Sequence, residues 1–208
     1  MMSKFAMVIN LGVCVGCNAC MAACSMENQT PVWDPQKFRT YVYDDEIQLG
    51  DKFIRQFFPK LCNHCDNPPC VSVCPTGATW KESNGIVRVN PETCMGCQAC
   101  AMACPYDARY GADSEDIRHG EAYYGKDFLK RAVPSIDKCD FCYDRLQENL
   151  QPACVETCVG HARIFGDLDN PNDLVTKIVA AGAAHTLLPE LGTRPNVYYV
   201  HKLPEGLL

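Results

Sequence analysis

The chain has 208 residues, of which 47% are hydrophobic and 16 are cysteine, and its formal charge is −6. An acidic chain is a poor candidate for nucleic-acid binding, because phosphate backbones attract basic surfaces, and no run of 18 apolar residues predicts a membrane-spanning helix. Without its cysteines the hydrophobic fraction is roughly 39%, which is modest for a self-sufficient core.

The first 60 residues combine one cysteine group with a mixed connector. Phe5 to Asn10 is predicted to form a strand. The apolar start of the chain has no small-residue cleavage site and no twin arginine, and it leads straight into Cys14, so it favours a strand over a signal peptide. Residues 20–28 are predicted to form a short helix. In the connector, residues 38–43 alternate like a strand, and Trp33 is expected to pack against its neighbours.

Residues 59–110 contain two further cysteine groups separated by a hairpin signal. Asn84-Gly85 lies between residues 78–81 and the β-rich residues 86–89. An Asn-Gly pair between such runs is the strongest short-range signal for a β-hairpin. The predicted order is therefore loop, helix, hairpin, loop, helix.

The segment 111–135 is charged and aromatic and contains no cysteine. Its aromatic residues include Tyr123, Tyr124 and Phe128. Two interpretations stay open. The segment is a solvated surface loop, or it is an insertion that contacts a partner, because long irregular loops often carry function.

The last third of the chain is predicted to alternate helices and strands. Residues 142–149 have a helix-friendly composition, and Arg163 to Phe165 is predicted to form a strand. The segment 170–173, Asn-Pro-Asn-Asp, is expected to cap a helix that runs to Ala181 and is closed by glycine. Residues 193–200 are expected to end in a strand.

The third cysteine group has the spacing of a bacterial ferredoxin. Cys94, Cys97, Cys100 and Cys104 are separated by two, two and three residues, and a proline follows. In that pattern three thiolates hold one 4Fe–4S cluster and the fourth ligates a second cluster. Gly96 would let the backbone pass close to the cluster. Residues 59–110 resemble an eight-cysteine bacterial ferredoxin from end to end.

Four related groups use all 16 cysteines, and 16 thiolates are what four 4Fe–4S clusters require. The candidate ligands are Cys14, Cys17, Cys20 and Cys24; Cys62, Cys65, Cys70 and Cys74; Cys94, Cys97, Cys100 and Cys104; and Cys139, Cys142, Cys154 and Cys158. Structural zinc sites and a secreted disulfide scaffold are the alternatives. Zinc ribbons use two cysteine pairs, whereas every group here closes with a three-residue gap. Disulfide frameworks belong mostly to shorter chains.

Three polar residues near the cysteine groups are candidates for tuning the clusters. Cluster potentials depend on hydrogen bonds to sulfur, local charge and solvent exposure. His64 lies inside the second group, Lys138 precedes the fourth, and Arg109 follows the third. We expect these side chains to act near a cluster.

The order of the four groups resembles the four-cluster iron–sulfur subunit of the dimethyl-sulfoxide-reductase family of molybdopterin oxidoreductases. The resemblance covers about residues 3–203. It rests on the second group, Cys62-Asn63-His64-Cys65-Asp66-Asn67-Pro68-Pro69-Cys70, and on the eleven-residue gap in the fourth group. The ending, with residues 165–168 and 192–199, is more similar to the polysulfide, thiosulfate, tetrathionate and arsenate reductase branch. The 111–135 insertion departs from the shorter polysulfide-type pattern.

The resemblance implies an α+β fold of two bacterial-ferredoxin-like units, one inserted in the other, with long loops. Residues 1–58 and 137–208 would form the outer domain, and residues 59–136 the inner domain, including the insertion. Each group would give its last cysteine to its paired group. The implied ligand sets are Cys94, Cys97, Cys100 with Cys74; Cys62, Cys65, Cys70 with Cys104; Cys139, Cys142, Cys154 with Cys24; and Cys14, Cys17, Cys20 with Cys158. The prolines after Cys74 and Cys104 support the exchange of last cysteines between the second and third groups.

The resemblance also implies a non-catalytic electron-transfer subunit carrying four 4Fe–4S clusters. Its partners would be a membrane quinol-oxidising subunit near the Cys94 cluster and a molybdopterin catalytic subunit near the Cys14 cluster. It would lie on the membrane through these partners, on the periplasmic face by co-export, with a cytoplasmic location as the alternative. With each oxidised cluster and its thiolates at about −2, the assembled protein would carry about −14. A freestanding soluble polyferredoxin and a zinc-stabilised interaction module are the rival functions.

Overall fold

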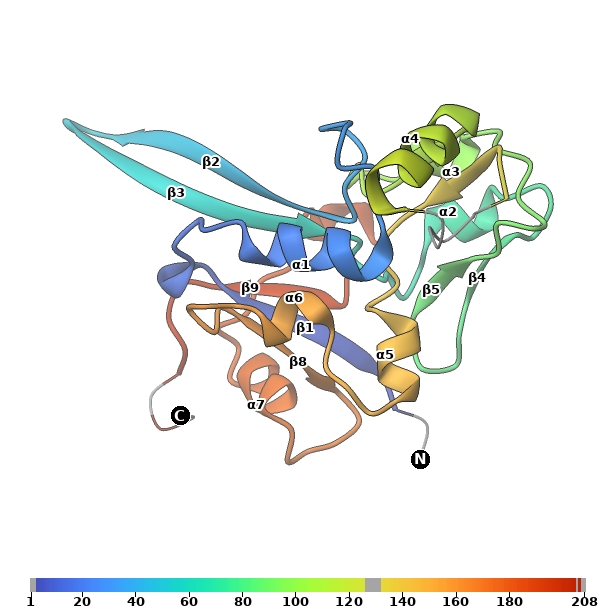
Figure 1. Cartoon of the computed structure of the whole chain (residues 1–208). Coiled ribbons are helices and arrows are strands. Elements are labelled where there is room, and N and C mark those ends of the chain that lie inside the picture. The colour runs from blue at the N-terminus through green and yellow to red at the C-terminus, as the bar shows by residue number, and fades with distance from the viewer. Residues whose placement is uncertain (1–2, 126–131, 205, 207–208) are drawn as a thin grey trace.

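The computed structural model describes residues 3–125, 132–204 and 206. A three-stranded sheet brings the two flanks of the chain together (Figure 1). It contains, in spatial order, β8 (Arg163–Asp167), β1 (Phe5–Asn10) and β9 (Val197–Val200). Strand β1 runs antiparallel to β8 and parallel to β9. The three strands predicted in these regions are confirmed.

The two faces of this sheet bury different cores, because successive side chains of a strand point to opposite faces. Ala6 and Val8 pack against α7 (Leu174–Ala180), which begins after Asp173 as predicted. Met7 and Ile9 belong to the larger core, which also contains buried cysteines. The helices of this half are α1 (Ala19–Asn28), α5 (Tyr143–Gln147) and α6 (Ala153–Glu156), with 3-10 turns η1 (Leu11–Val13) and η2 (Pro189–Leu191). Figure 1 shows α1 and α7 on opposite sides of the sheet.

The middle of the chain forms smaller elements that pair among themselves. They are α2 (Pro69–Ser72), β4 (Thr79–Lys81), β5 (Val87–Val89), α3 (Ala99–Met102), β6 (Tyr110–Ala112) and β7 (Ser135–Asp137). Strands β4 and β5 form the predicted hairpin, and β6 pairs antiparallel with β7. Helices α2 and α3, which each begin within a cysteine group, contact each other.

A long hairpin connects the first and second cysteine groups, where only a short strand was predicted. Strands β2 (Thr40–Leu49) and β3 (Lys52–Leu61) pair over their full length, and their tip extends beyond the rest of the molecule (Figure 1). The turn contains Gly50 at φ 61°, a backbone conformation that glycine adopts without strain. Gly50-Asp51 is itself a recognised two-residue hairpin signal, so this hairpin could have been predicted from the sequence.

The expectation of an irregular segment at 111–135 was wrong for its described part. Helix α4 (Ser114–Tyr124) occupies most of it. Asp113 caps the helix by accepting hydrogen bonds from the backbone of Glu115 and Asp116, and the Asp116 side chain accepts from the backbone of Asp113 in return. This reciprocal capping box is readable from sequence. Residues 126–131, with Phe128, lie outside the described residues.

Helix α4 packs on the connector that follows α1. The Trp33 ring lies 5.7 Å from the ring of His119 and 6.3 Å from that of Tyr124. The Tyr124 hydroxyl donates to the carbonyl oxygen of Thr30 at 2.8 Å. The ammonium group of Lys37 forms an ion pair with a carboxylate of α4 at 2.9 Å. The predicted packing of Trp33 is therefore confirmed, and its partner is α4.

Replacing Trp33 with alanine should loosen α4 while leaving the cysteine loops intact. Because the ring is half-buried, we expect a loss of roughly 1–3 kcal/mol, below the range for fully buried tryptophans. Amide hydrogen exchange should become faster in residues 114–124. Unchanged exchange there would mean that the ion pairs of Lys37 hold α4 by themselves.

Candidate metal centres

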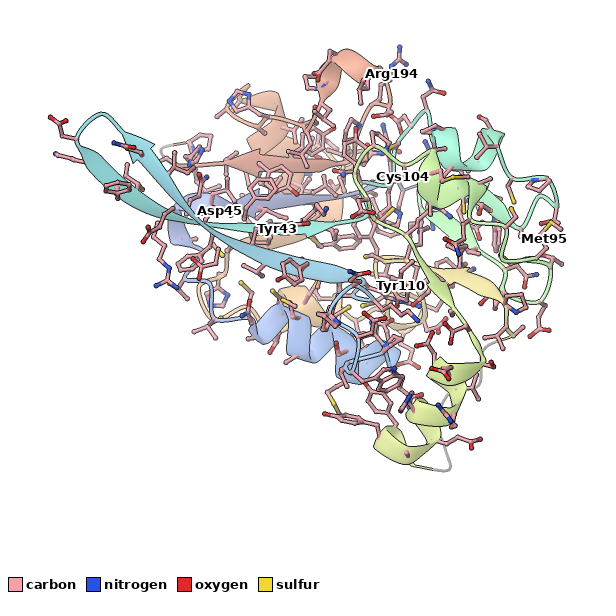
Figure 2. The ribbon with its side chains drawn as sticks, turned by 90° about the horizontal axis from the view of Figure 1, so that it is seen from above. Tyr43, Asp45, Met95, Cys104, Tyr110 and Arg194 are labelled. Carbon is pink, nitrogen blue, oxygen red and sulfur yellow. The ribbon has the colours of Figure 1, made fainter. Side chains whose placement is uncertain are left out.

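The 16 cysteines differ systematically in exposure. Two are exposed, Cys17 and Cys97, and they lie in the loops that precede α1 and α3. Five are half-buried: Cys14, Cys74, Cys94, Cys104 and Cys158. The others are buried. The two loops with exposed thiols lie on different sides of the molecule in Figure 1. Figure 2 shows Met95, from the second of these loops, at the end of the molecule opposite the hairpin tip.

Two cavities each bring together four cysteines from two groups. The first cavity joins the first and fourth groups and is lined by Cys14, Cys17, Cys20 and Cys158. The second cavity joins the second and third groups and is lined by Cys62, Cys65, Cys70 and Cys104. The first and fourth groups also meet at Asn28, whose amide nitrogen lies 3.5 Å from the sulfur of Cys24 and 3.8 Å from that of Cys142.

Glycines in the two exposed loops are required for close packing. A Cβ atom on Gly16 would lie 2.2 Å from the Phe57 ring, and one on Gly96 would lie 2.6 Å from Cβ of Pro134. Both glycines have positive φ, 64° and 68°. The expected reason for Gly96 was approach to a cluster; the contact that the structure gives is with Pro134.

Four of the buried thiols, those of Cys24, Cys65, Cys139 and Cys142, have a raised pKa. Burial raises the pKa of Cys65 to about 12 and that of Cys142 to about 11. Burial also raises the pKa values of Cys24 and Cys139. Metal binding must displace these protons and supply the missing positive charge.

The donor set around each cavity fits a cluster better than a single ion. Four sulfur donors around a mainly apolar cavity match the ligand set of a 4Fe–4S cluster. Among the described residues, no three His, Cys, Asp or Glu side chains are arranged to hold a single metal ion.

Arg109 lies against the sulfurs of the second and third groups. Its Nη2 donates to the sulfur of Cys70 at 3.0 Å, and its Nη1 donates to Oγ1 of Thr79 at 3.2 Å. Burial opposes its charge, but Cys70, Cys62 and Cys100 outweigh burial and raise the pKa of Arg109. This candidate therefore contacts sulfur directly, as a permanent cation.

Arg163, which sequence reasoning missed, occupies the corresponding position between the first and fourth groups. Its Nη1 donates to the sulfur of Cys154 at 3.6 Å, and its Nη2 donates to the sulfur of Cys20 at 3.5 Å. Nη2 also donates to Oγ1 of Thr40 at 2.8 Å. A sequence signal existed, because both arginines follow an alanine and come five residues after the last cysteine of a group.

The other two candidates contact backbone groups rather than sulfur: both reach Val87 of β5, and Lys138 also reaches Cys139. His64 is completely buried, and its Nδ1 accepts a hydrogen bond from the Val87 amide at 3.1 Å. Burial, followed by the charges of Lys138 and Arg109, lowers the pKa of His64 well below its usual value, so the ring is neutral. Lys138 donates to the carbonyl oxygens of Val87 and Cys139.

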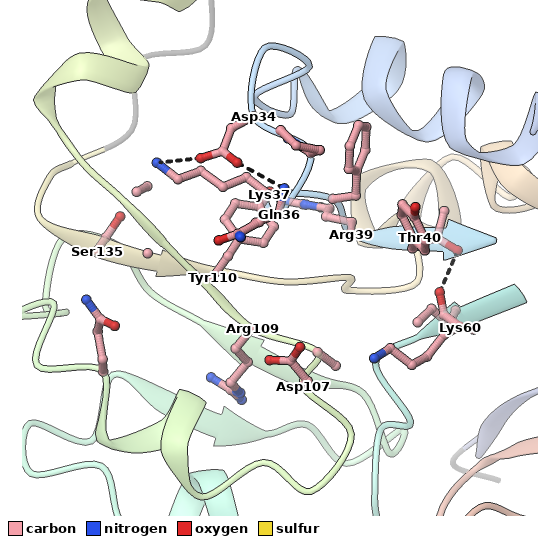
Figure 3. A pocket seen from close by; sticks show the side chains of 18 of the residues that line it. Asp34, Gln36, Lys37, Arg39, Thr40, Lys60, Asp107, Arg109, Tyr110 and Ser135 are labelled. Carbon is pink, nitrogen blue, oxygen red and sulfur yellow. Dashed lines mark hydrogen bonds and ion pairs between the residues drawn. The ribbon is translucent and has the colours of Figure 1, made fainter. Parts of the chain in front are cut away.

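A second missed cation, Arg39, supports the region of Cys24 and Cys142. It forms a two-bond ion pair with Asp137, at 2.8 and 3.1 Å, and it donates to Oδ1 of Asn28 at 2.7 Å. Asn28 is thereby oriented with its amide nitrogen toward the two sulfurs. Arg39 also lines an open cleft of 760 Å³, together with residues of β2 and β6 (Figure 3).

Comparison with known proteins identifies the four cysteine groups as 4Fe–4S cluster sites. Two family models, each described as a 4Fe–4S dicluster domain, match the chain, one at residues 53–119 and 112–168 and the other at residues 13–78. A subunit of tetrathionate reductase from Salmonella typhimurium is 41% identical over 201 residues, which cover 95% of this chain and 72% of the relative. The chain belongs to the iron–sulfur subunits of the molybdopterin oxidoreductase family.

Other relatives agree with this family. The arsenate respiratory reductase iron–sulfur subunit ArrB from Shewanella sp. is 36% identical over 229 residues, covering 95% of this chain and 96% of the relative. A subunit of selenate reductase from Mesobacillus selenatarsenatis is 36% identical over 212 residues, covering 95% of this chain and 72% of the relative. The predicted electron-transfer function and 4Fe–4S clusters are confirmed, and the zinc and disulfide alternatives are wrong. No helix among the described residues could cross a bilayer.

Replacing Arg163 with glutamine should lower the reduction potentials of the clusters that use Cys20 and Cys154. The guanidinium favours added negative charge, and about 1.4 kcal/mol corresponds to about 59 mV for a one-electron couple, so we expect shifts on the order of tens of millivolts. Redox titration followed by paramagnetic resonance measures the potentials. Arg109→Gln is the matched control and should shift the other two clusters. Equal shifts of all four clusters in both variants would contradict a local effect.

Proposed function

We propose that this subunit relays electrons through four 4Fe–4S clusters between a membrane quinol-oxidising subunit and a molybdopterin catalytic subunit of a respiratory reductase. The observation that carries the proposal is the exposure of the cysteines. Cys17 and Cys97 are exposed in loops on different sides of the molecule, whereas three cysteines of the second group, three of the fourth and both of α1 are buried. Bound clusters supply one-electron carriers. With exposed cysteines in two separate loops and buried cysteines between them, a chain of four clusters would have one accessible cluster at each end.

The ligand sets that we propose pair the first group with the fourth and the second with the third, as the family resemblance implies. Two of the four sets are supported by the shared cavities. The set that contains Cys24 is supported by the contacts of Asn28 with Cys24 and Cys142. The set of Cys94, Cys97, Cys100 and Cys74 follows from the spacing and from the family.

We further propose the inserted arrangement, with residues 1–58 and 137–208 as the outer domain and 59–136 as the inner one. The pairing of β1 with β8 and β9 supports it, because all three strands come from the flanks. The pairing of β4 with β5, within the middle segment, supports it too. Strand β7 ends one residue beyond the proposed boundary.

Exposed apolar side chains at both ends support partners over a freestanding polyferredoxin. At the end that carries the first group, Val15 is 60% exposed and Val159 is 71% exposed. At the end that carries the third group, Met95 and Met102 are 58% and 82% exposed. Apolar groups gathered at the accessible clusters suit docking surfaces.

The names of the relatives suggest which partners these surfaces meet. The relatives are subunits of reductases. We propose a catalytic partner at the end that carries Cys14 and a membrane partner at the end that carries Cys94, on the periplasmic face.

Purification of the native complex under anaerobic conditions tests this function. Mass spectrometry should find a large molybdenum-containing chain and a membrane-integral chain with this subunit. Recovery of this chain alone and monodisperse, with a full set of clusters, would favour the freestanding polyferredoxin.

The metal content should be about 16 iron and 16 inorganic sulfide per chain, the stoichiometry of four cubane clusters. Metal analysis and sulfide assay of the anaerobically purified protein measure it. A content near half of these amounts, with half of the thiols open to alkylation, would contradict four clusters.

The variant Cys74→Ser should disturb the cluster held by Cys94, Cys97 and Cys100, because we propose that Cys74 is its fourth ligand. Serine oxygen is a harder and poorer iron ligand than thiolate, so a shifted potential or loss of one iron is expected. The matched variant Cys62→Ser should disturb a different paramagnetic resonance signal. If both variants alter the same signal, the last cysteine of each group serves its own group and the proposed sets are wrong.

A further inference from the structure

The residue before the second cysteine of each group has the same unusual backbone conformation. Gly16, His64, Gly96 and Phe141 occupy this position, with φ of 64°, 43°, 68° and 56°. The two groups that carry an exposed cysteine use glycine. The two groups whose Cys-X-X-Cys loops are buried use a side chain with a ring.

The two rings are held in a conformation that favours glycine. A positive φ is unfavourable for a residue with a Cβ atom, a cost that Gly16 and Gly96 avoid. Strained non-glycine residues of this kind cluster at functional positions and persist only where the surroundings enforce them. His64 and Phe141 therefore need a compensating interaction.

That interaction is a contact between the two rings themselves. The rings of His64 and Phe141 stack with centroids 3.8 Å apart and an interplanar angle of 24°. The exposed fractions are 0% for His64 and 1% for Phe141. One ring comes from the loop between Cys62 and Cys65 and the other from the loop 139–142, so the stack joins the second cysteine group to the fourth.

Several hydrogen bonds fix the stack in place. The Val87 amide donates to Nδ1 of His64 at 3.1 Å, and Nδ2 of Asn196 donates to the carbonyl oxygen of His64 at 2.7 Å. The Phe141 amide donates to the sulfur of a cysteine in its own loop at 3.4 Å. Phe141 also contacts the Phe165 ring in a T-shaped arrangement, with centroids 5.1 Å apart.

We propose that the His64–Phe141 stack is the electronic contact between the two ferredoxin-like units. This inference rests on the proposed ligand sets, in which the loop of His64 holds one buried cluster and the loop of Phe141 holds the other. One electron crosses the stack, so one of these clusters is oxidised by one electron and the other is reduced by one. His64 keeps its proton on Nε2 throughout, because Nδ1 is an acceptor, and no proton transfer accompanies the step.

The variant Phe141→Leu tests the proposal in the native complex. Leucine keeps an apolar side chain but removes the stacked ring. After rapid mixing with a substoichiometric one-electron reductant, freeze-quenched paramagnetic resonance follows how reduced clusters redistribute between the units. We expect a several-fold slower redistribution, with unchanged iron content and unchanged cluster potentials.

The matched control is Phe165→Leu, which makes the same chemical change in the same core but leaves the stack intact. It should redistribute electrons at the rate of the unaltered protein. Phe141→Tyr, which keeps a ring, should also keep the rate. His64→Gly introduces glycine, the residue found at this position in the two loops with exposed cysteines. It removes the strain of the positive φ but also removes one ring of the stack, so it should slow electron redistribution as Phe141→Leu does.

Two further measurements separate an electronic role of the stack from a packing role and from an error in the proposed ligand sets. The dipolar splitting between the reduced buried clusters reports their separation, and it should be the same in Phe141→Leu and Phe165→Leu. Equal rates in these two variants, with the splitting unchanged, would mean that the stack only packs the units together and would overturn the proposal. If the proposed ligand sets are wrong, Cys74→Ser and Cys62→Ser will alter the same paramagnetic resonance signal. That outcome does not depend on the rate of electron redistribution in the ring variants.

Discussion

The constraint on which this structure depends is the burial of negative charge. Each 4Fe–4S cluster with its four thiolates carries about −2 when oxidised, and more than half of the cysteine thiols lie in the interior. Burial of an uncompensated charge is costly. The charge of about −2 already includes the iron, and each half of the molecule adds one buried guanidinium, Arg109 or Arg163, within reach of cysteine sulfur. Each arginine also donates to a threonine hydroxyl, which holds its planar group in one orientation.

The two halves use the same local solutions, and each half contains one cysteine group with an exposed thiol and one whose Cys-X-X-Cys thiols are buried. Arg109 and Arg163 follow equivalent cysteines at the same spacing. The loop position that requires a positive φ carries glycine in the exposed groups, where it also allows close packing against a neighbouring ring. In the buried groups the position carries His64 and Phe141, which contact each other. The ferredoxin repeat is thus adapted at one backbone position to meet either solvent-facing or internal neighbours.

Local patterns were sufficient to predict most elements, and contacts distant in sequence were not. The apolar run in Phe5–Asn10 and the Asn84-Gly85 turn determine their strands within a few residues, and both predictions were correct. The β2–β3 hairpin was predicted too short because charged residues interrupt the apolar alternation near its tip. The capping box of α4 was present but overlooked in a charged segment. Arg163 reaches the sulfur of Cys20 across 143 positions, and only the fold brings these two residues together.

The two segments that enlarge the ferredoxin pattern stabilise each other and join the halves of the molecule. The connector after α1 contributes Trp33 and Lys37, and the segment after β6 contributes α4 with the buried Asp116. A few residues later in the connector, Arg39, whose side chain is 11% exposed, binds Asp137 at the end of β7. An arginine–carboxylate pair with two hydrogen bonds restricts orientation as well as distance. Because electron transfer between fixed carriers depends on their separation, contacts that hold these two segments together also fix the distances between the cysteine groups.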